Sequence, residues 1–215
     1  EVVDINQTSK KAVKELGVLI RLRKLSMVGK GRFAEQKRKT LYICTAIEKL
    51  CSLHSLSLDV DLDGSLEWLH NVSSPPSLLK KLTLAGELGG KMPEWVGSLK
   101  HLVKIHLRWS ELKEDQVSEM LGVLPKLKLL SLGVWAHVGK KLVFRARSFA
   151  NHRKLCVNHL DKLREVGFEQ GALPQIEMLE FSLCDLHSGI IGIDHLPVVK
   201  QISLGRKGRV ANLGM

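Results

Sequence analysis

The stretch LVKIHLRW, from Leu102 to Trp109, alternates apolar with cationic side chains. Its apolar residues follow the frame LxxLxL, with Leu102, Ile105 and Leu107 at the frame positions. Successive side chains of an extended strand point to opposite faces, so Ile105 and Leu107 share one face and the residues between them share the other. The stretch therefore predicts a strand with one buried face and one positively charged face.

The same frame, or a close variant of it, recurs along the chain. Its third position falls at Leu25, Leu56, Leu82, Ile105, Leu130, Leu155, Leu179 and Ile202. The intervals are 31, 26, 23, 25, 25, 24 and 23 residues, and all but the first lie within the roughly 20–29 residues of a leucine-rich repeat. Because one repeat cannot bury its apolar side alone, we predict an α/β solenoid. It would be a leucine-rich-repeat horseshoe of about eight irregular repeats with a parallel concave β-sheet.

Three segments between the strands predict short helices or turns on the convex side. Residues 115–124 place apolar residues at helical spacing, with Asp115 as the expected N-cap and Pro125 after the end. Residues 41–53 have a similar amphipathic pattern, and residues 92–99 predict a turn followed by a short helix. Helices are wider than the spacing between strands, so the sheet should lie on the inside of the arc.

The composition is that of a globular protein with an excess of positive charge. The 215 residues are 44% hydrophobic, and their formal net charge is +11, which favours acidic partners. The four cysteines show no dense disulfide pattern, so we predict reduced thiols and a cytoplasmic location, with the nucleus as an alternative. No apolar run approaches the ~20 residues of a membrane span.

The predicted domain organisation is a single solenoid over residues 1–215. The segment at about 29–40 is basic and has no apolar period, and we interpret it as an inserted loop in the long first interval. The chain begins at Glu1 without an initiator methionine or a signal peptide, and it looks like an excerpt of a longer protein.

Two CxxH pairs, Cys51 with His54 and Cys156 with His159, could in principle bind zinc. They belong to the second and sixth repeats, so four inter-strand steps would separate them by roughly 19 Å, too far for one ion. We therefore predict no metal site. Cys51 and Cys184 are expected to be small core residues instead.

No catalytic motif occurs in the sequence. Gly90-Lys91 and Gly139-Lys140 lack both the first glycine and the Ser or Thr of a phosphate-binding loop, and no GxSxG or HExxH is present. We predict that the region is not an enzyme and binds no cofactor.

The concave face is the best candidate for a binding surface, because alternate strand residues point away from the buried leucines. The predicted protein-binding residues are Lys81, Lys104, His106, Arg108, Trp109, Trp135, Lys154, Asn158 and Glu180. The two tryptophans lie just past strand ends, and a partly exposed Trp beside Arg is a frequent centre of binding energy. That both tryptophans pack into the solenoid edge remains an alternative. With only 5% aromatic residues, specific nucleic-acid binding is not expected.

Five phrases carry a family resemblance over nearly the whole chain. They are VKELGVLIRLRKL (13–25), MPEWVGSL (92–99), GKKLVF (139–144), LREVGFEQGALP (163–174) and GIDHLP (192–197). The sequence resembles the leucine-rich-repeat region of plant coiled-coil-type nucleotide-binding leucine-rich-repeat (NLR) disease-resistance proteins, particularly those of grasses.

The resemblance implies an immune receptor that senses a pathogen effector directly or through a guarded host protein. In that family the repeats also restrain the receptor's own nucleotide-binding module, and ADP or ATP is expected only in that module, which this chain lacks. No functional residue can be carried over, because recognition surfaces differ between members. Two alternatives stay open: a substrate adaptor of a ubiquitin ligase or other binding scaffold, and non-specific nucleic-acid binding through residues 30–39.

Overall fold

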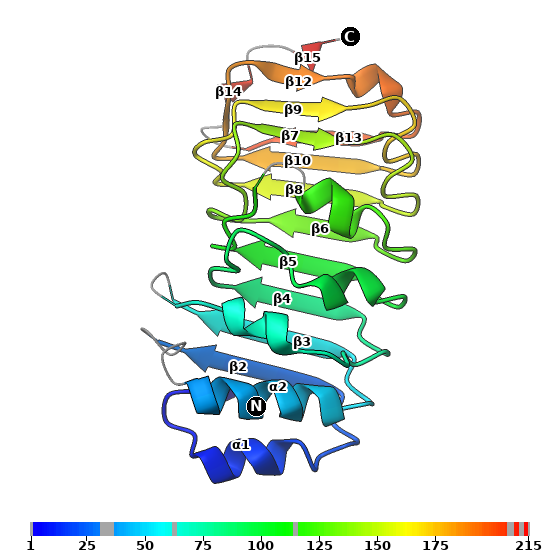
Figure 1. Cartoon of the computed structure of the whole chain (residues 1–215). Helices are drawn as coiled ribbons and strands as arrows, with labels where there is room; N and C mark the ends of the chain where they lie inside the picture. The colour runs from blue at the N-terminus through cyan, green and yellow to red at the C-terminus, as the bar shows by residue number, and fades with distance from the viewer. Residues whose placement is uncertain are drawn as a thin grey trace.

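The structure, a computed structural model, describes residues 2–30, 37–61, 64–113, 116–205, 209–210 and 213–214. Its main feature is a nine-stranded parallel sheet with the order β1-β2-β3-β4-β5-β6-β8-β10-β13, which forms an elongated stack (Figure 1). The strands are β1 (Val2–Asp4), β2 (Lys24–Gly29), β3 (Ser55–Val60), β4 (Lys81–Ala85), β5 (Lys104–Arg108), β6 (Leu129–Leu132), β8 (Lys154–Asn158), β10 (Met178–Ser182) and β13 (Gln201–Leu204). All eight strands expected from the leucine frame are present, so the predicted solenoid is confirmed.

The frame residues form one continuous row across the sheet. The row runs through Leu25, Leu56, Leu82, Ile105, Leu130, Leu155, Leu179 and Ile202. All of them are buried except Ile202, which is 37% exposed in the last strand of the sheet. The strands stack in register because each repeat buries the same position against its neighbours.

The first strand and the first helix were not predicted. β1 pairs with β2, and α1 (Lys10–Leu16) begins after Ser9, whose side chain accepts a hydrogen bond from the amide of Ala12. Neither segment carries the leucine frame, which explains why the repeat pattern gave no sign of them. Ile5, directly after β1, and Val13 of α1 are nonetheless fully buried, so this N-terminal segment extends the core.

Short helices cover one face of the sheet in the N-terminal half (Figure 1). They are α2 (Lys37–Lys49), the 3₁₀ helices η2 (Glu67–Asn71) and η3 (Glu94–Ser98), and the π-helix η4 (Val117–Leu121). α2 begins inside the loop expected at 29–40, while residues 31–36 lie outside the described residues. The helix expected over 115–124 is only five residues long, because Gly122 and Pro125 disfavour its continuation. Asp115, its expected cap, also lies outside the described residues.

The C-terminal half differs from the prediction of convex helices. In this half a second parallel sheet, with the order β15-β12-β9-β7, covers the nine-stranded sheet in place of helices. Its strands are β7 (Lys141–Phe144), β9 (Glu165–Phe168), β12 (Gly189–Ile191) and β15 (Leu213–Gly214). Aromatic and β-branched residues favour extended backbone here, and the Phe144 and Phe168 rings stack at 5.3 Å. The remaining elements are β11 (Asp185–Leu186), β14 (Arg209–Val210) and η5 (Ile193–His195).

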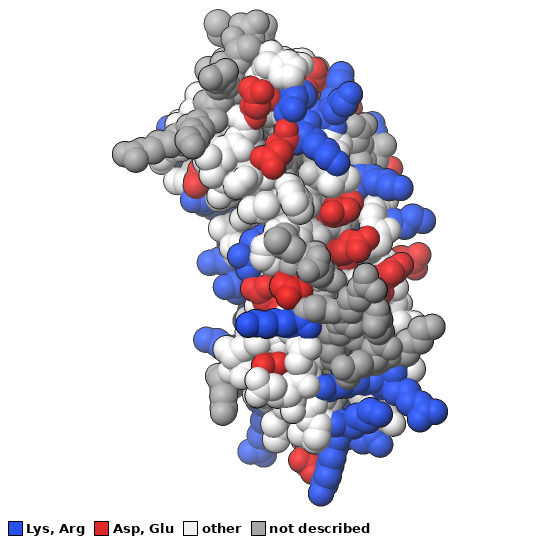
Figure 2. Space-filling view, turned by 90° about the vertical axis from the view of Figure 1, so that its left-hand side faces the viewer, with Lys and Arg blue, Asp and Glu red and all other residues white. Residues whose placement is uncertain are grey.

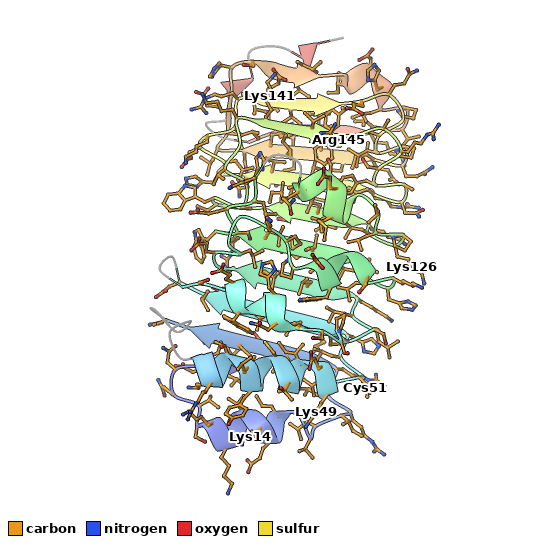
Figure 3. All side chains as sticks on the ribbon, in the orientation of Figure 1. Lys14, Lys49, Cys51, Lys126, Lys141 and Arg145 are labelled. Carbon is orange, nitrogen blue, oxygen red and sulfur yellow. The ribbon has the colours of Figure 1, made fainter. Side chains whose placement is uncertain are left out.

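The cysteines do not all lie where the sequence predicted. Cys184 and Cys44 are buried, and Cys156 is half-buried on the sheet, but Cys51 is exposed. The expectation that Cys51 is a core residue is therefore wrong, because it follows the end of α2 at the edge of the solenoid (Figure 3). None of the helices within the described ranges has both the length and the apolar character that crossing a membrane requires.

Candidate protein-binding surface

The nine-stranded sheet has one face that neither the helices nor the second sheet covers, and we call it the open face. In β5 the residues of the covered face, Ile105 and Leu107, are 0% exposed. Lys104 and Arg108 are exposed, and His106 is half-buried on the open face. The alternation predicted from the sequence is confirmed, and it places three cationic or titratable side chains on the central strand.

Lys81 and Lys104 are direct neighbours on the open face, because their Cα atoms are register partners in β4 and β5. His106 lies one row further along, next to Thr83. Partial burial lowers the pKa of His106, and the positive charges of Lys81 and Lys104 lower it further. The positive charge of this group therefore comes from the two lysines rather than from the imidazole.

Arg108 is not a free cation. Its guanidinium Nη2 donates a hydrogen bond to Asp59 Oδ2 at 2.7 Å, and the two side chains are 45% and 39% exposed. The same guanidinium lies 5.1 Å from the ring centroid of Trp109, within range of a cation–π contact. Part of the charge that the sequence assigned to the surface is thus already neutralised within the protein.

The second group of predicted residues lies beyond β6. Lys154 Nζ is 3.1 Å from Glu180 Oε2, and Cys156 Sγ donates to the same carboxylate at 3.6 Å. Asn158 is exposed at the end of the same strand. Leu129 of β6 stands between Lys104 and Lys154 in the register. The predicted site residues therefore form two separate groups, one cationic and one with a neutralising pair.

The two tryptophans differ in exposure. Trp109 is half-buried, and its indole Nε1 is buried without a hydrogen-bond partner among the described residues. Trp135 is 45% exposed and donates a hydrogen bond from Nε1 to Asp161 Oδ2 at 3.2 Å. Trp109 therefore packs partly into the solenoid edge, whereas the Trp135 side chain is open to solvent.

The sheet carries opposite charges at its two edges. We call the edge where its strands begin the entry edge and the edge where they end the exit edge. Basic residues directly precede the strands at the entry edge: Arg23, Lys80, Lys128, Arg153 and Lys200. Acidic residues lie at or just after the strand ends at the exit edge: Asp59, Asp61, Glu87, Glu111, Asp161 and Asp185. Figure 2 shows the exit edge, where carboxylates gather along the middle of the view and cations lie mostly at its margins.

Sequence reasoning missed this division of charge, although its signal is simple. Lysine or arginine stands one position before the strand in five of the eight repeats, whereas His54, Val103 and Glu177 hold that position before β3, β5 and β10. The Glu177 carboxylate accepts hydrogen bonds from Arg153 at 2.8 Å and Lys200 at 3.1 Å. The hydrogen bond and the charge of Lys200 lower the pKa of Glu177, with a weaker contribution from Arg153.

Within the described part of the chain, no group of three or more His, Cys, Asp or Glu side chains is arranged to hold a metal ion. The two CxxH pairs belong to the repeats of β3 and β8, and strands β4, β5 and β6 lie between them.

Comparison with known proteins agrees with the fold and with the quoted phrases. Residues 1–212 match the family model described as a leucine-rich repeat region. The chain is 29% identical over 198 residues, 92% of its length, to the disease resistance protein RPM1 of Arabidopsis thaliana. It is 24% identical to the disease resistance protein PIK6-NP of Oryza sativa subsp. japonica, over an alignment of 223 positions that covers 94% of the chain.

These matches confirm the resemblance to plant disease-resistance proteins, including those of a grass. The chain covers 20% of the Arabidopsis protein and 21% of the rice protein, so it spans about a fifth of their length. The stacked parallel strands, the leucine frame in register and the match over nearly all residues lead to one conclusion: the chain belongs to the leucine-rich repeat region family.

Proposed function

We propose that the chain is the protein-recognition and autoinhibition module of an intracellular plant immune receptor and has no catalytic role. The observation that carries the proposal is the pair Lys81 and Lys104 at the centre of the open face, in a chain whose relatives are disease resistance proteins. Neither lysine has an acidic partner among the described residues, so both charges are available to another protein. The partner would be a pathogen effector or a guarded host protein.

The nucleotide of such a receptor, ADP or ATP, would bind to a separate nucleotide-binding module, which the repeats would restrain at rest. The proposed location is the cytoplasm, with the nucleus as a second compartment. No cofactor is assigned to the repeats. Cationic side chains on an exposed face favour an acidic partner and accelerate encounter at low salt, which agrees with the formal net charge of +11.

The test is charge reversal at the lysine pair in the full-length receptor. Lys81→Glu with Lys104→Glu should abolish the response to the effector or release autoinhibition, because an acidic partner would then meet like charges. Lys100→Glu with Lys126→Glu makes the same change in net charge at two exposed residues outside the strands, and serves as the control. The response to the effector is measured as cell death with effector, and autoinhibition as cell death without it, at matched protein levels.

Arg108→Glu is a useful third variant because Asp59 already neutralises this side chain. It should change the response less than the lysine pair does. A double reversal at Lys81 and Lys104 that leaves effector response and resting inhibition at the control level would exclude the open face as the recognition surface.

A further inference from the structure

A pocket of about 400 Å³ opens at the exit edge, beside the open face. It is lined by Glu111, Trp135, His137, Val138, Asp161 and Lys162. These residues come from the segments that follow β5, β6 and β8, so three successive repeats build it. Trp135, which is 45% exposed, is the largest of the lining residues.

The Trp135 side chain is held in place before any ligand arrives. Its Nε1 donates to Asp161 Oδ2 at 3.2 Å, and its backbone carbonyl accepts from the amide of Glu111 at 3.0 Å. Asp161 Oδ1 also lies 3.6 Å from His159 Nε2. The indole is therefore anchored through its polar atom, while part of the ring stays open to solvent.

The backbone beside the pocket is strained. Trp135 and Glu111 have φ angles of 49° and 50°, in the left-handed region that residues with a Cβ rarely adopt. Such conformations cost free energy and persist where the surrounding structure enforces them, often at ligand-binding positions. Two of the eight non-glycine residues with positive φ in the described part of the chain, Trp135 and Glu111, line this pocket.

The charges of the lining determine the kind of ligand. Glu111 and Asp161 contribute carboxylates, and Lys162 contributes the one cation among the lining residues. His137 is 1% exposed, and its Nε2 lies 2.9 Å from the carbonyl of Lys141, which engages this nitrogen. An anionic group would meet the carboxylates, whereas a cation would meet an aromatic face and two carboxylates together.

We propose that this pocket receives a lysine or arginine side chain of a partner protein. This proposal rests on the proposed function in one respect: it takes from it that the ligand of the pocket is a protein. It does not depend on Lys81 and Lys104, which lie on β4 and β5 and do not line the pocket. A partner that used both sites would present acidic residues to the open face and a basic residue to the exit edge.

The experiment uses blocked tripeptides as probes: acetyl-Gly-Arg-Gly-amide, acetyl-Gly-Lys-Gly-amide, and the neutral acetyl-Gly-Gln-Gly-amide. Titration into the full chain is followed by the NMR signal of the Trp135 indole N–H, assigned from its loss in Trp135→Phe. The cationic peptides should shift this signal in a saturable way and the glutamine peptide should not. The indole of Trp95 is 6% exposed and bonded to the carbonyl of Leu69, so its signal should stay fixed.

Removing a negative charge and removing a positive charge from the pocket lining should change the affinity for the arginine peptide in opposite directions. Glu111→Gln should weaken binding of the arginine peptide roughly fivefold, and Lys162→Gln should strengthen it by a similar factor. Asp185→Asn, at an exposed exit-edge carboxylate outside the pocket, is the matched control and should change binding little.

Two results would overturn the proposal: equal shifts with the neutral peptide, or weaker binding of the arginine peptide to Lys162→Gln. Lys81→Glu with Lys104→Glu should leave peptide binding unchanged. Its effect on the receptor response therefore reports on the open face separately from the pocket.

Discussion

Arg108 bonds to Asp59 across an intervening strand. The guanidinium Nη2 and Asp59 Oδ2 are 2.7 Å apart, although β4 separates the two strands that carry them. Ala85 occupies the register position between them, and its short side chain leaves room for the bond. Arg108, predicted from the sequence as a binding residue, is thus paired with Asp59 within the protein.

The coupling between Arg108 and Asp59 should be small. Both side chains are partly exposed, at 45% and 39%, and exposed ion pairs contribute about 0.2–1 kcal/mol. A double-mutant cycle with Arg108→Ala and Asp59→Ala, measured by urea unfolding, should give a value in that range that decreases with added salt. A coupling well above 1 kcal/mol would show that solvent screens this pair less than its exposure implies.

Leu130→Ala tests the leucine frame. Leu130 is 0% exposed in β6, and its truncation should lower the free energy of unfolding by about 2–5 kcal/mol, because it leaves a cavity between stacked repeats. The adjacent Leu129 is half-buried on the open face, so Leu129→Ala is a control that should cost clearly less. Similar losses for the two variants would contradict the assignment of faces in this strand.

His152→Leu should stabilise the protein, most of all at acidic pH. His152 occupies the first leucine position of its repeat and is 0% exposed. Burial lowers its pKa from 6.5 to about 4, against weaker opposing effects of the backbone at Leu127 and Lys154. The unfolded state therefore binds more protons as pH falls, and stability present above pH 6.5 is lost towards pH 4.

A shift of this size corresponds to about 3 kcal/mol. Urea unfolding at pH 7, 5 and 4 should show a gap between His152→Leu and the natural sequence that widens as pH falls. His187→Leu, at an exposed histidine, is the control for replacing a histidine by leucine outside the core. A gap that stays constant with pH would mean that His152 does not titrate on unfolding.

Lys104→Gln should raise the pKa of His106. The pKa of this histidine is lowered first by burial and then by Lys81 and Lys104, so removing one positive charge relieves part of the shift. The measurement is an NMR titration of the His106 ring protons. Lys126→Gln, which changes a distant exposed lysine, should leave the pKa where it is; an equal rise would indicate a general field rather than a local contact.

The leucine frame predicted the sheet because every repeat must bury the same positions, and a mismatch of one residue would expose a leucine. Register follows from the frame too, so the contact between Arg108 and Asp59 could have been predicted once Ala85 was placed between them. β7 and β9 escaped prediction because they lie between successive frames of the main series, where the sequence predicted helices or turns.

The exit-edge pocket could not be predicted from the sequence, for a different reason. Trp135 was recognised as a candidate, but Glu111 and Asp161 lie in connecting segments whose lengths differ between repeats. Their positions depend on backbone conformations such as the positive φ of Glu111, which no residue type in the sequence signals. Glu111 and Asp161 each stand three residues after the end of their strand, so the repeat places their backbone, but the period does not show that Trp135 lies against Asp161 to form a pocket.

The second sheet has a geometric consequence for the C-terminal half. Strands are spaced by about 4.8 Å, whereas packed helices need about 8–10 Å. Where strands line both sides of the solenoid, inner and outer repeats advance by the same step, and nothing forces the stack to turn. Each added repeat there extends the protein along a straight axis by the spacing of one strand.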